Sequence, residues 1–120
     1  MDELTHGDLR IERLADHATP TYCWKGKSNE RNPTEILRPF FRAVLTAAAG
    51  QAQPVEMHFE QLEHFNSSTI SAIIQLVQEA KVQGVKLVLV YDQKLKWQKL
   101  SFDALRVFVK ADQMLELRAS

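Results

Sequence analysis

The stretch over residues 55–77 reads VEMHFEQLEHFNSSTISAIIQLV and contains the clearest secondary-structure pattern of the chain. Its first part alternates apolar and polar residues over 55–59, which is the period of a half-buried strand. Its last part has apolar residues at positions i, i+3, i+4 and i+7, the spacing of one face of a helix. These residues are Ile70, Ile73, Ile74 and Val77. A strand that leads into an amphipathic helix predicts an α/β fold.

The polar run Asn66-Ser67-Ser68-Thr69 joins the predicted strand to the predicted helix. Asparagine and serine are preferred N-cap residues, and a helix end exposes their side chains. Functional surfaces of open α/β sheets gather beyond the carboxyl ends of the strands, where this run is expected to lie. Two interpretations are open at this point. The run is a helix cap alone, with Asn66 or Ser67 as the capping residue, or it also carries a functional hydroxyl.

Upstream of this stretch the pattern predicts two strands and a helix. Residues 9–14 alternate apolar and charged side chains, and 21–25 form a β-prone run that Gly26 is expected to end. A helix is predicted to start after Asn32, because Pro33 suits the first helical position and Glu35 stands at capping-box spacing. Gly50 is expected to end that helix.

Downstream, Gly84 is expected to end the central helix. Residues 85–91 are almost continuously apolar, as in a strand that is covered on both faces. A third helix is predicted from the apolar spacing over 97–108, and a last strand over 114–117. The predicted order is ββαβαβαβ. The sequence thus predicts one domain over 1–120, of α/β class, with a mixed, mostly parallel sheet and helices packed on it.

Composition excludes several classes of function. The chain has 120 residues with 15 cationic and 15 acidic side chains, so it lacks the basic excess that nucleic-acid binding or a polybasic membrane contact needs. No apolar run is long enough to span a membrane, and the first residues show no signal-peptide pattern. We therefore expect a cytoplasmic protein without nucleic-acid or membrane partners.

We expect no cofactor and no metal ion. The sequence has no glycine-rich phosphate loop. His58 and His64 do not stand at ligand spacing with other donors, and we interpret them as ordinary surface or packing residues. Cys23 is the only cysteine and lies between two aromatic residues on a predicted strand, so we assign it to the core.

The stretch from Met57 to Ile73 resembles the centre of a STAS domain, the domain of the bacterial anti-sigma factor antagonists. Those proteins have an apolar strand, a short turn, an Asp-Ser-Ser-Gly-like element and an apolar helix. Their phosphorylated serine follows the aspartate directly, which corresponds to Ser67 here. This chain departs from the pattern at Asn66, where the acid usually stands, and at Thr69, where glycine usually stands.

The departures are similar to those in the SiaC-like family of biofilm-regulation phosphoproteins, which are STAS-like and carry Asn-Thr-Ser-Ser-Ile at this point. Two other stretches resemble the same family: Gly26-Lys27-Ser28 followed by Asn32 and Glu35, and Tyr91-Asp92. The resemblance implies a non-enzymatic protein switch. It implies that a protein kinase phosphorylates Ser67, that a PP2C-type phosphatase reverses this, and that the unmodified form binds and activates a diguanylate cyclase.

The resemblance leaves parts of the site open. Asn66, Ser68 and Thr69 are expected to shape the helix start, and Ser68 and Thr69 compete with Ser67 as acceptors. The partner surface is expected to include the loop residues Ser28, Asn29, Glu30, Arg31 and Asn32 together with Lys96 and Trp97. The expected downstream partner is a diguanylate cyclase. The alternative is that the chain is an anti-sigma factor antagonist, with an anti-sigma factor as its partner, or a STAS module of a stress-signalling complex. A rival hypothesis from another class is a hydrolase or transferase with Ser67 as nucleophile and His64 as its base.

Overall fold

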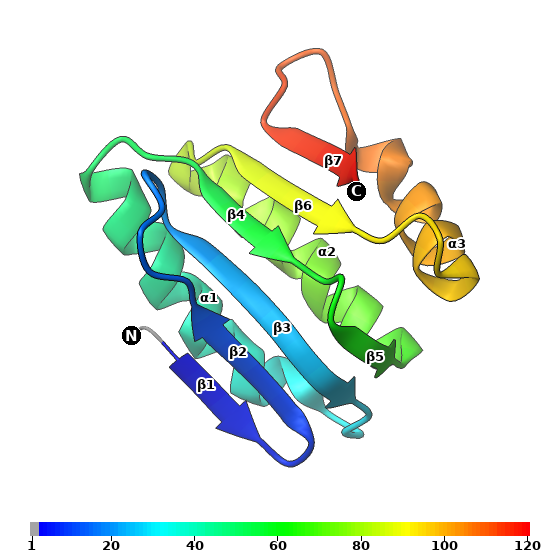
Figure 1. Cartoon of the computed structure of the whole chain (residues 1–120). Helices are drawn as coiled ribbons and strands as arrows, with labels where there is room; N and C mark the ends of the chain where they lie inside the picture. Colours follow the sequence, from blue (N-terminus) through cyan, green and yellow to red (C-terminus); the bar gives the residue numbers. More distant parts are fainter. Residues whose placement is uncertain (1–2) are drawn as a thin grey trace.

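A computed structural model, which describes residues 3–120, has an α/β architecture with a seven-stranded mixed sheet and three α-helices (Figure 1). The strands are β1 (Glu3–His6), β2 (Leu9–Arg13), β3 (Thr21–Ser28), β4 (Val55–His58), β5 (Leu62–Phe65), β6 (Leu87–Tyr91) and β7 (Leu115–Ala119). The helices are α1 (Pro33–Gly50), α2 (Ser67–Gln83) and α3 (Lys96–Ala104), and a 3₁₀ turn, η1 (Leu105–Phe108), continues α3. The predicted fold class is confirmed.

The sheet has the order β1-β2-β3-β4-β6-β7, with β5 paired beside the end of β3. The two N-terminal pairings are antiparallel, and β3–β4, β3–β5, β4–β6 and β6–β7 are parallel. Helices α1 and α2 lie side by side behind the sheet in Figure 1, and α3 lies beyond the end of β6. Since the parallel strands point the same way, their carboxyl ends meet at one side, where α1, α2 and α3 begin.

The core lies between the sheet and the helices and is rich in aromatic side chains. Trp24 of β3 is fully buried and packs against Phe59, with 4.7 Å between the ring centroids. Phe59 in turn packs at 5.0 Å on Phe102 of α3, and Phe102 stacks on Tyr91. This chain of rings joins β3, the end of β4 and α3, so the elements around the carboxyl ends of the strands share one packed layer.

The N-terminal part differs from the prediction in two respects. It contains three strands and not two, because residues 3–6 pair with β2 through a turn at Gly7, whose φ is +58°. This edge strand is polar, so its sequence does not show the alternation of a half-buried strand. Gly26 does not end β3. It has a φ of +82° and lies so close to the carbonyl of Asp8 that a Cβ would be 2.0 Å from that oxygen. Glycine therefore allows this close approach, and β3 continues past it to Ser28.

The segment between α1 and α2 also holds one strand more than predicted. After β4, the chain turns at residues 59–61 and forms β5, which pairs with the end of β3. The sequence predicts only a turn there, because β5 is four residues long with just its two ends buried. The strand exists through its backbone pairing to Ser28, and this pairing places Phe65 and the start of α2 next to the end of β3.

The two long helices start and end differently. In α2, Asn66 caps the start with its side chain, which decides between the two capping residues that the sequence left open. Gly84 ends the helix as predicted, with a φ of +69°. In α1, Asn32 precedes Pro33 but makes no capping hydrogen bond with its side chain, so the predicted capping box is wrong. Gly50 is the last helical residue of α1, and the left-handed conformation falls on Ala52, at a φ of +53°.

Candidate functional site

The predicted site is the first turn of α2, and Asn66 organises it. The Asn66 side-chain oxygen accepts a hydrogen bond of 2.9 Å from the backbone N–H of Thr69, which is the N-cap interaction. Its side-chain nitrogen donates to the carbonyl of Glu30 at 2.9 Å, and its backbone N–H donates to the carbonyl of Ser28 at 3.1 Å. Asn66 thus ties the start of α2 to the loop that follows β3.

Thr69 lies beneath this cap and is fully buried. Its hydroxyl is 2.7 Å from the hydroxyl of Ser28, 2.9 Å from the side-chain oxygen of Asn66 and 3.2 Å from the carbonyl of Ser28. A hydroxyl has one proton to donate and can accept two hydrogen bonds. Thr69 therefore donates to one of the two acceptors, and Ser28 donates to Thr69. The network holds the backbone of the helix start in one position.

The three hydroxyl groups of the run differ in exposure. Ser67, the first helical residue, is exposed, Ser68 is half-buried, and Thr69 is buried. Within residues 3–120, the hydroxyls of Ser67 and Ser68 make no hydrogen bond, whereas that of Thr69 is fully engaged. An enzyme that modifies one of these groups in the folded protein therefore reaches Ser67 most directly, and Thr69 only after the network opens.

The loop residues predicted for the partner surface lie beside this helix start. Ser28 is buried and positions Thr69, so its side chain is not part of the surface. Asn29, Arg31 and Asn32 are exposed, and Glu30 is half-buried with its carbonyl bound to Asn66. The loop and the start of α2 thus form one surface, held together by the contacts of Asn66.

Lys96 and Trp97 begin α3, and Trp97 reaches the site through Phe65. The ring of Trp97 is half-buried and meets the ring of Phe65 edge-on, with 5.1 Å between centroids. Phe65 directly precedes Asn66 in the chain. Lys96 is exposed. The structure therefore brings Trp97 against the strand that leads into the site, while Lys96 points to solvent at the edge of the same region.

Sequence reasoning missed Gln98, which fastens α3 to the turn between β4 and β5. Its side chain is fully buried, and its nitrogen donates to the carbonyls of Phe59 at 2.6 Å and Leu62 at 3.1 Å. Its oxygen accepts from the backbone N–H of Asp92 at 2.9 Å. The signal was available in the sequence: Gln98 stands four residues before Phe102, so it is a polar residue on the apolar face of α3.

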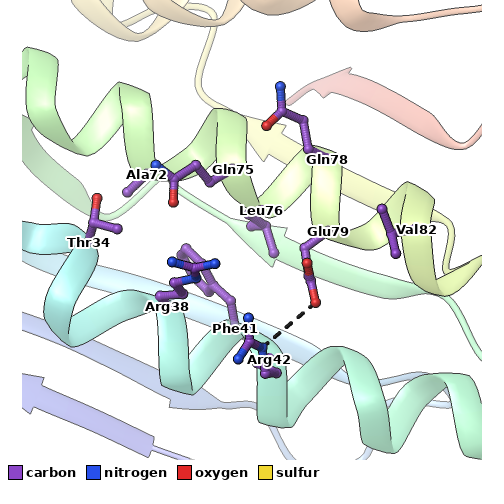
Figure 2. A pocket seen from close by; sticks show the side chains of 10 residues that line it. All are labelled: Thr34, Arg38, Phe41, Arg42, Ala72, Gln75, Leu76, Gln78, Glu79 and Val82. Carbon is purple, nitrogen blue, oxygen red and sulfur yellow. Dashed lines mark ion pairs between the residues drawn. The ribbon is translucent and has the colours of Figure 1, made fainter.

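From Ala72 onward, α2 borders a groove whose lining does not include Ser67. The exposed positions of α2 recur at helical spacing, and they are Ser67, Ser71, Gln75, Gln78 and Val82. The groove, of about 360 Å³, lies between α1 and α2 and is floored by Phe41 and Leu76 (Figure 2). Arg42 of α1 and Glu79 of α2 face each other across it at 3.8 Å.

The other candidate residues, His58, His64 and Cys23, contact neighbouring side chains or are buried. Both ring nitrogens of His58 contact carboxylates, Glu56 at 2.7 Å and Glu60 at 2.8 Å. The ring of His64 lies 6.3 Å from that of Trp97. Cys23 is buried as predicted, and burial raises the pKa of its thiol. In the described part of the chain, no group of three or more histidine, cysteine, aspartate or glutamate side chains is placed to hold a metal ion.

Two further observations concern membrane-spanning helices and similarity to known proteins. None of the helices found over residues 3–120 has the length and apolar character needed to cross a membrane. No protein-family model and no curated protein matches this chain.

Proposed function

We propose that this protein is a non-enzymatic binding switch of the STAS type, controlled by phosphorylation of Ser67. The proposal is carried by the contrast, at the start of α2, between an exposed hydroxyl and the hydrogen-bonded structure beneath it. An exposed hydroxyl at the first helical position stands directly after Asn66, which donates two hydrogen bonds to the loop after β3 and accepts one from the backbone of Thr69 in α2. The acceptor is thus accessible, while the structure beneath it is fixed.

The physics of a helix start suits this role. Phosphorylation adds a charge of about −1.5 to −2 at neutral pH. The start of a helix carries unpaired N–H groups and a partial positive charge, which stabilise an anion. The first turn of α2 contains no acidic residue that would repel the phosphate. The fold therefore tolerates the modification, whereas a partner packed over Ser67 loses complementarity through charge and bulk.

The cellular partners follow the resemblance. A protein kinase modifies Ser67, a PP2C-type phosphatase removes the phosphate, and the unmodified protein binds and activates a diguanylate cyclase in the cytoplasm. The partner contacts Asn29, Arg31 and Asn32 of the loop and the exposed face of α2. The alternative downstream partner is an anti-sigma factor, on which the same surface would act in the same way.

The acceptor is tested by incubating the purified protein with the kinase encoded next to its gene and ATP, then mapping the phosphate by mass spectrometry. We expect one phosphate on Ser67 and none on the Ser67→Ala variant. Ser71→Ala is the matched control, because Ser71 is an exposed serine one turn further along the same face. Efficient labelling of Ser67→Ala would assign the acceptor to another residue and contradict the proposal.

The partner is tested by adding the protein to a purified diguanylate cyclase from the same gene neighbourhood and measuring cyclic di-GMP formation. We expect stimulation by the unmodified protein and its loss after phosphorylation. Stimulation that does not change with phosphorylation would contradict the switch. Binding to an anti-sigma factor without any effect on the cyclase would select the alternative partner.

A further inference from the structure

Exposed apolar side chains gather on one segment of the molecule, outside the site at Ser67. Residues 3–120 contain five large apolar side chains that are substantially exposed, and four of them lie between residues 95 and 109. They are Leu95, Leu100, Val107 and Val109. Such clustering on a small domain marks an interaction surface, whereas single exposed apolar residues are ordinary.

The centre of this surface is the outer face of α3 and η1. Leu100 and Val107 are each 64% exposed and stand seven residues apart, which is two helical turns, so they lie on the same side. Ala104 is exposed between them. The inner side of the element is complete without them, because Gln98, Phe102 and Leu105 are buried there. The outer apolar residues therefore do not contribute to the core.

This surface also carries the largest charge imbalance associated with any of the helices. Residues 94–110 contain five cationic side chains and one acidic side chain, Asp103, although the chain as a whole is balanced. Lys99 and Arg106 share Asp103, at 2.8 Å and 3.2 Å, and these hydrogen bonds lower the pKa of its carboxyl group. In the described structure Lys94, Lys96 and Lys110 form no ion pair.

We infer that the outer face of α3 and η1 is a docking surface for an acidic amphipathic helix of a partner protein. The apolar strip through Leu100 and Val107 requires apolar contacts, and the ammonium groups beside it require carboxylates, so the complementary surface is apolar with an acidic border. This inference does not rest on the switch at Ser67, because α3 and η1 contain none of residues 66–69. Of the residues used here, only Lys96 also belongs to the partner surface predicted for that switch.

Val82 shows what distinguishes this surface from simple exposure. It is the fifth exposed apolar residue and, at 82%, the most exposed. It stands alone on the outer face of α2, beside Gln78 and Glu79 in the groove of Figure 2. Since α2 has no other exposed large apolar side chain in the described part of the chain, Val82 serves as the matched control for substitutions on α3.

The test uses two synthetic amphipathic helical peptides of about 18 residues, or five turns, one of leucine and glutamate and one of leucine and lysine. Each is titrated into the ¹⁵N-labelled full chain, and amide shifts are followed by NMR. We expect the acidic peptide to move the signals of Leu100, Ala104 and Val107, with an affinity that falls as salt rises. The Leu100→Ser/Val107→Ser variant should bind at least about tenfold more weakly, and Val82→Ser as tightly as the parent.

A charge reversal completes the test. Lys94→Glu/Lys96→Glu should lose the acidic peptide and gain the basic one, while its NMR spectrum shows the same fold. Four outcomes would overturn the inference. The acidic peptide does not bind, both peptides bind equally well, the NMR shifts are confined to another face, or the protein binds only to vesicles that contain phosphatidylglycerol. Concentration-dependent self-association lost in Leu100→Ser/Val107→Ser would instead assign the face to a second copy. Labelling of Ser67 by the kinase is scored separately, so either proposal can fail alone.

Discussion

Helices α1 and α2 lie side by side on one face of the sheet and carry the same sequence signals, yet only α2 uses them. Each is preceded by an asparagine and has a glycine at its end. In α2, Asn66 caps the helix with its side chain and Gly84 takes the left-handed conformation. In α1, Asn32 makes no capping bond with its side chain, and Ala52 takes the positive φ in place of Gly50.

Tertiary contacts decide whether a capping residue in the sequence caps its helix. Two hydrogen bonds besides the cap hold Asn66 in place. Its backbone N–H donates to the carbonyl of Ser28, and its side-chain nitrogen donates to the carbonyl of Glu30. Asn32 is exposed at the end of a loop and has no such anchors in the described structure. Pro33 also has no N–H group, so the start of α1 has one unpaired backbone donor fewer than that of α2.

The largest effect is expected from Asn66→Ala. This change removes the cap on Thr69, one partner of the buried Thr69 hydroxyl and the anchor to Glu30, so the free energy of unfolding should fall by about 2–3 kcal/mol. Asn32→Ala should change it by less than about 0.5 kcal/mol, because no capping bond is lost. Urea denaturation followed by circular dichroism measures both.

Equal effects of the two substitutions would contradict this comparison. A loss in Asn32→Ala as large as that in Asn66→Ala would mean that Asn32 caps α1 in solution. A loss below about 0.5 kcal/mol in Asn66→Ala would mean that the hydrogen bonds around Asn66 contribute no more than an ordinary surface contact.

The sequence predicted the helices and strands in which apolar residues recur with a strong period. It did not predict the strands that form through backbone pairing, or the strand that continues past a close backbone contact. The apolar stripe of α2 and the buried run of β6 are visible in the sequence because packing repeats along them. Strands β1 and β5 are short and partly polar, so they exist through backbone pairing that no periodicity reports. Gly26 has the sequence signature of a strand end, yet it allows β3 to pass close to Asp8.

The candidate site was predictable in position but not in the roles of its residues. The run from Asn66 to Thr69 was located by its capping chemistry and its place after a strand. The sequence could not separate its three hydroxyls, because exposure depends on Ser28, which is 41 residues from Thr69 in the chain. Ser28, expected at the surface, instead positions Thr69 from below.

Thr69→Val tests the buried network with a side chain of nearly the same shape. It leaves the hydroxyl of Ser28 and the side-chain oxygen of Asn66 each with one partner fewer, so the free energy of unfolding should fall by about 1–2 kcal/mol. Ser67→Ala is the matched control and should cost less than about 0.5 kcal/mol, because that hydroxyl is exposed. Equal losses in both variants, measured by urea denaturation, would show that the network is not the source of stability at this helix start.

Gly84 and Gly50, the glycines at the ends of α2 and α1, should change the free energy of unfolding in opposite directions when each is replaced by alanine. Gly84→Ala should lower the free energy of unfolding by about 1 kcal/mol, because a side chain at a φ of +69° is strained even where space is free. Gly50→Ala should raise it by about 0.5 kcal/mol, because Gly50 is helical and a Cβ there meets no atom within 4 Å. Thermal unfolding of both variants checks the signs. A destabilised Gly50→Ala would mean that α1 ends earlier than residue 50.

The smallest effect concerns charge at the two helix starts. The first turn of α1 contains Glu35, whereas that of α2 contains no acidic residue. Ser67→Glu should therefore raise the free energy of unfolding by about 0.3–1 kcal/mol at low ionic strength. Ser67→Gln controls for helix propensity, which is similar for glutamate and glutamine, and the advantage of Ser67→Glu over it should shrink at high salt. If Ser67→Glu instead destabilises the protein in low salt, a negative charge at this position works against the fold. Phosphorylation would then act by loosening the start of α2 and not by blocking a partner on an intact surface.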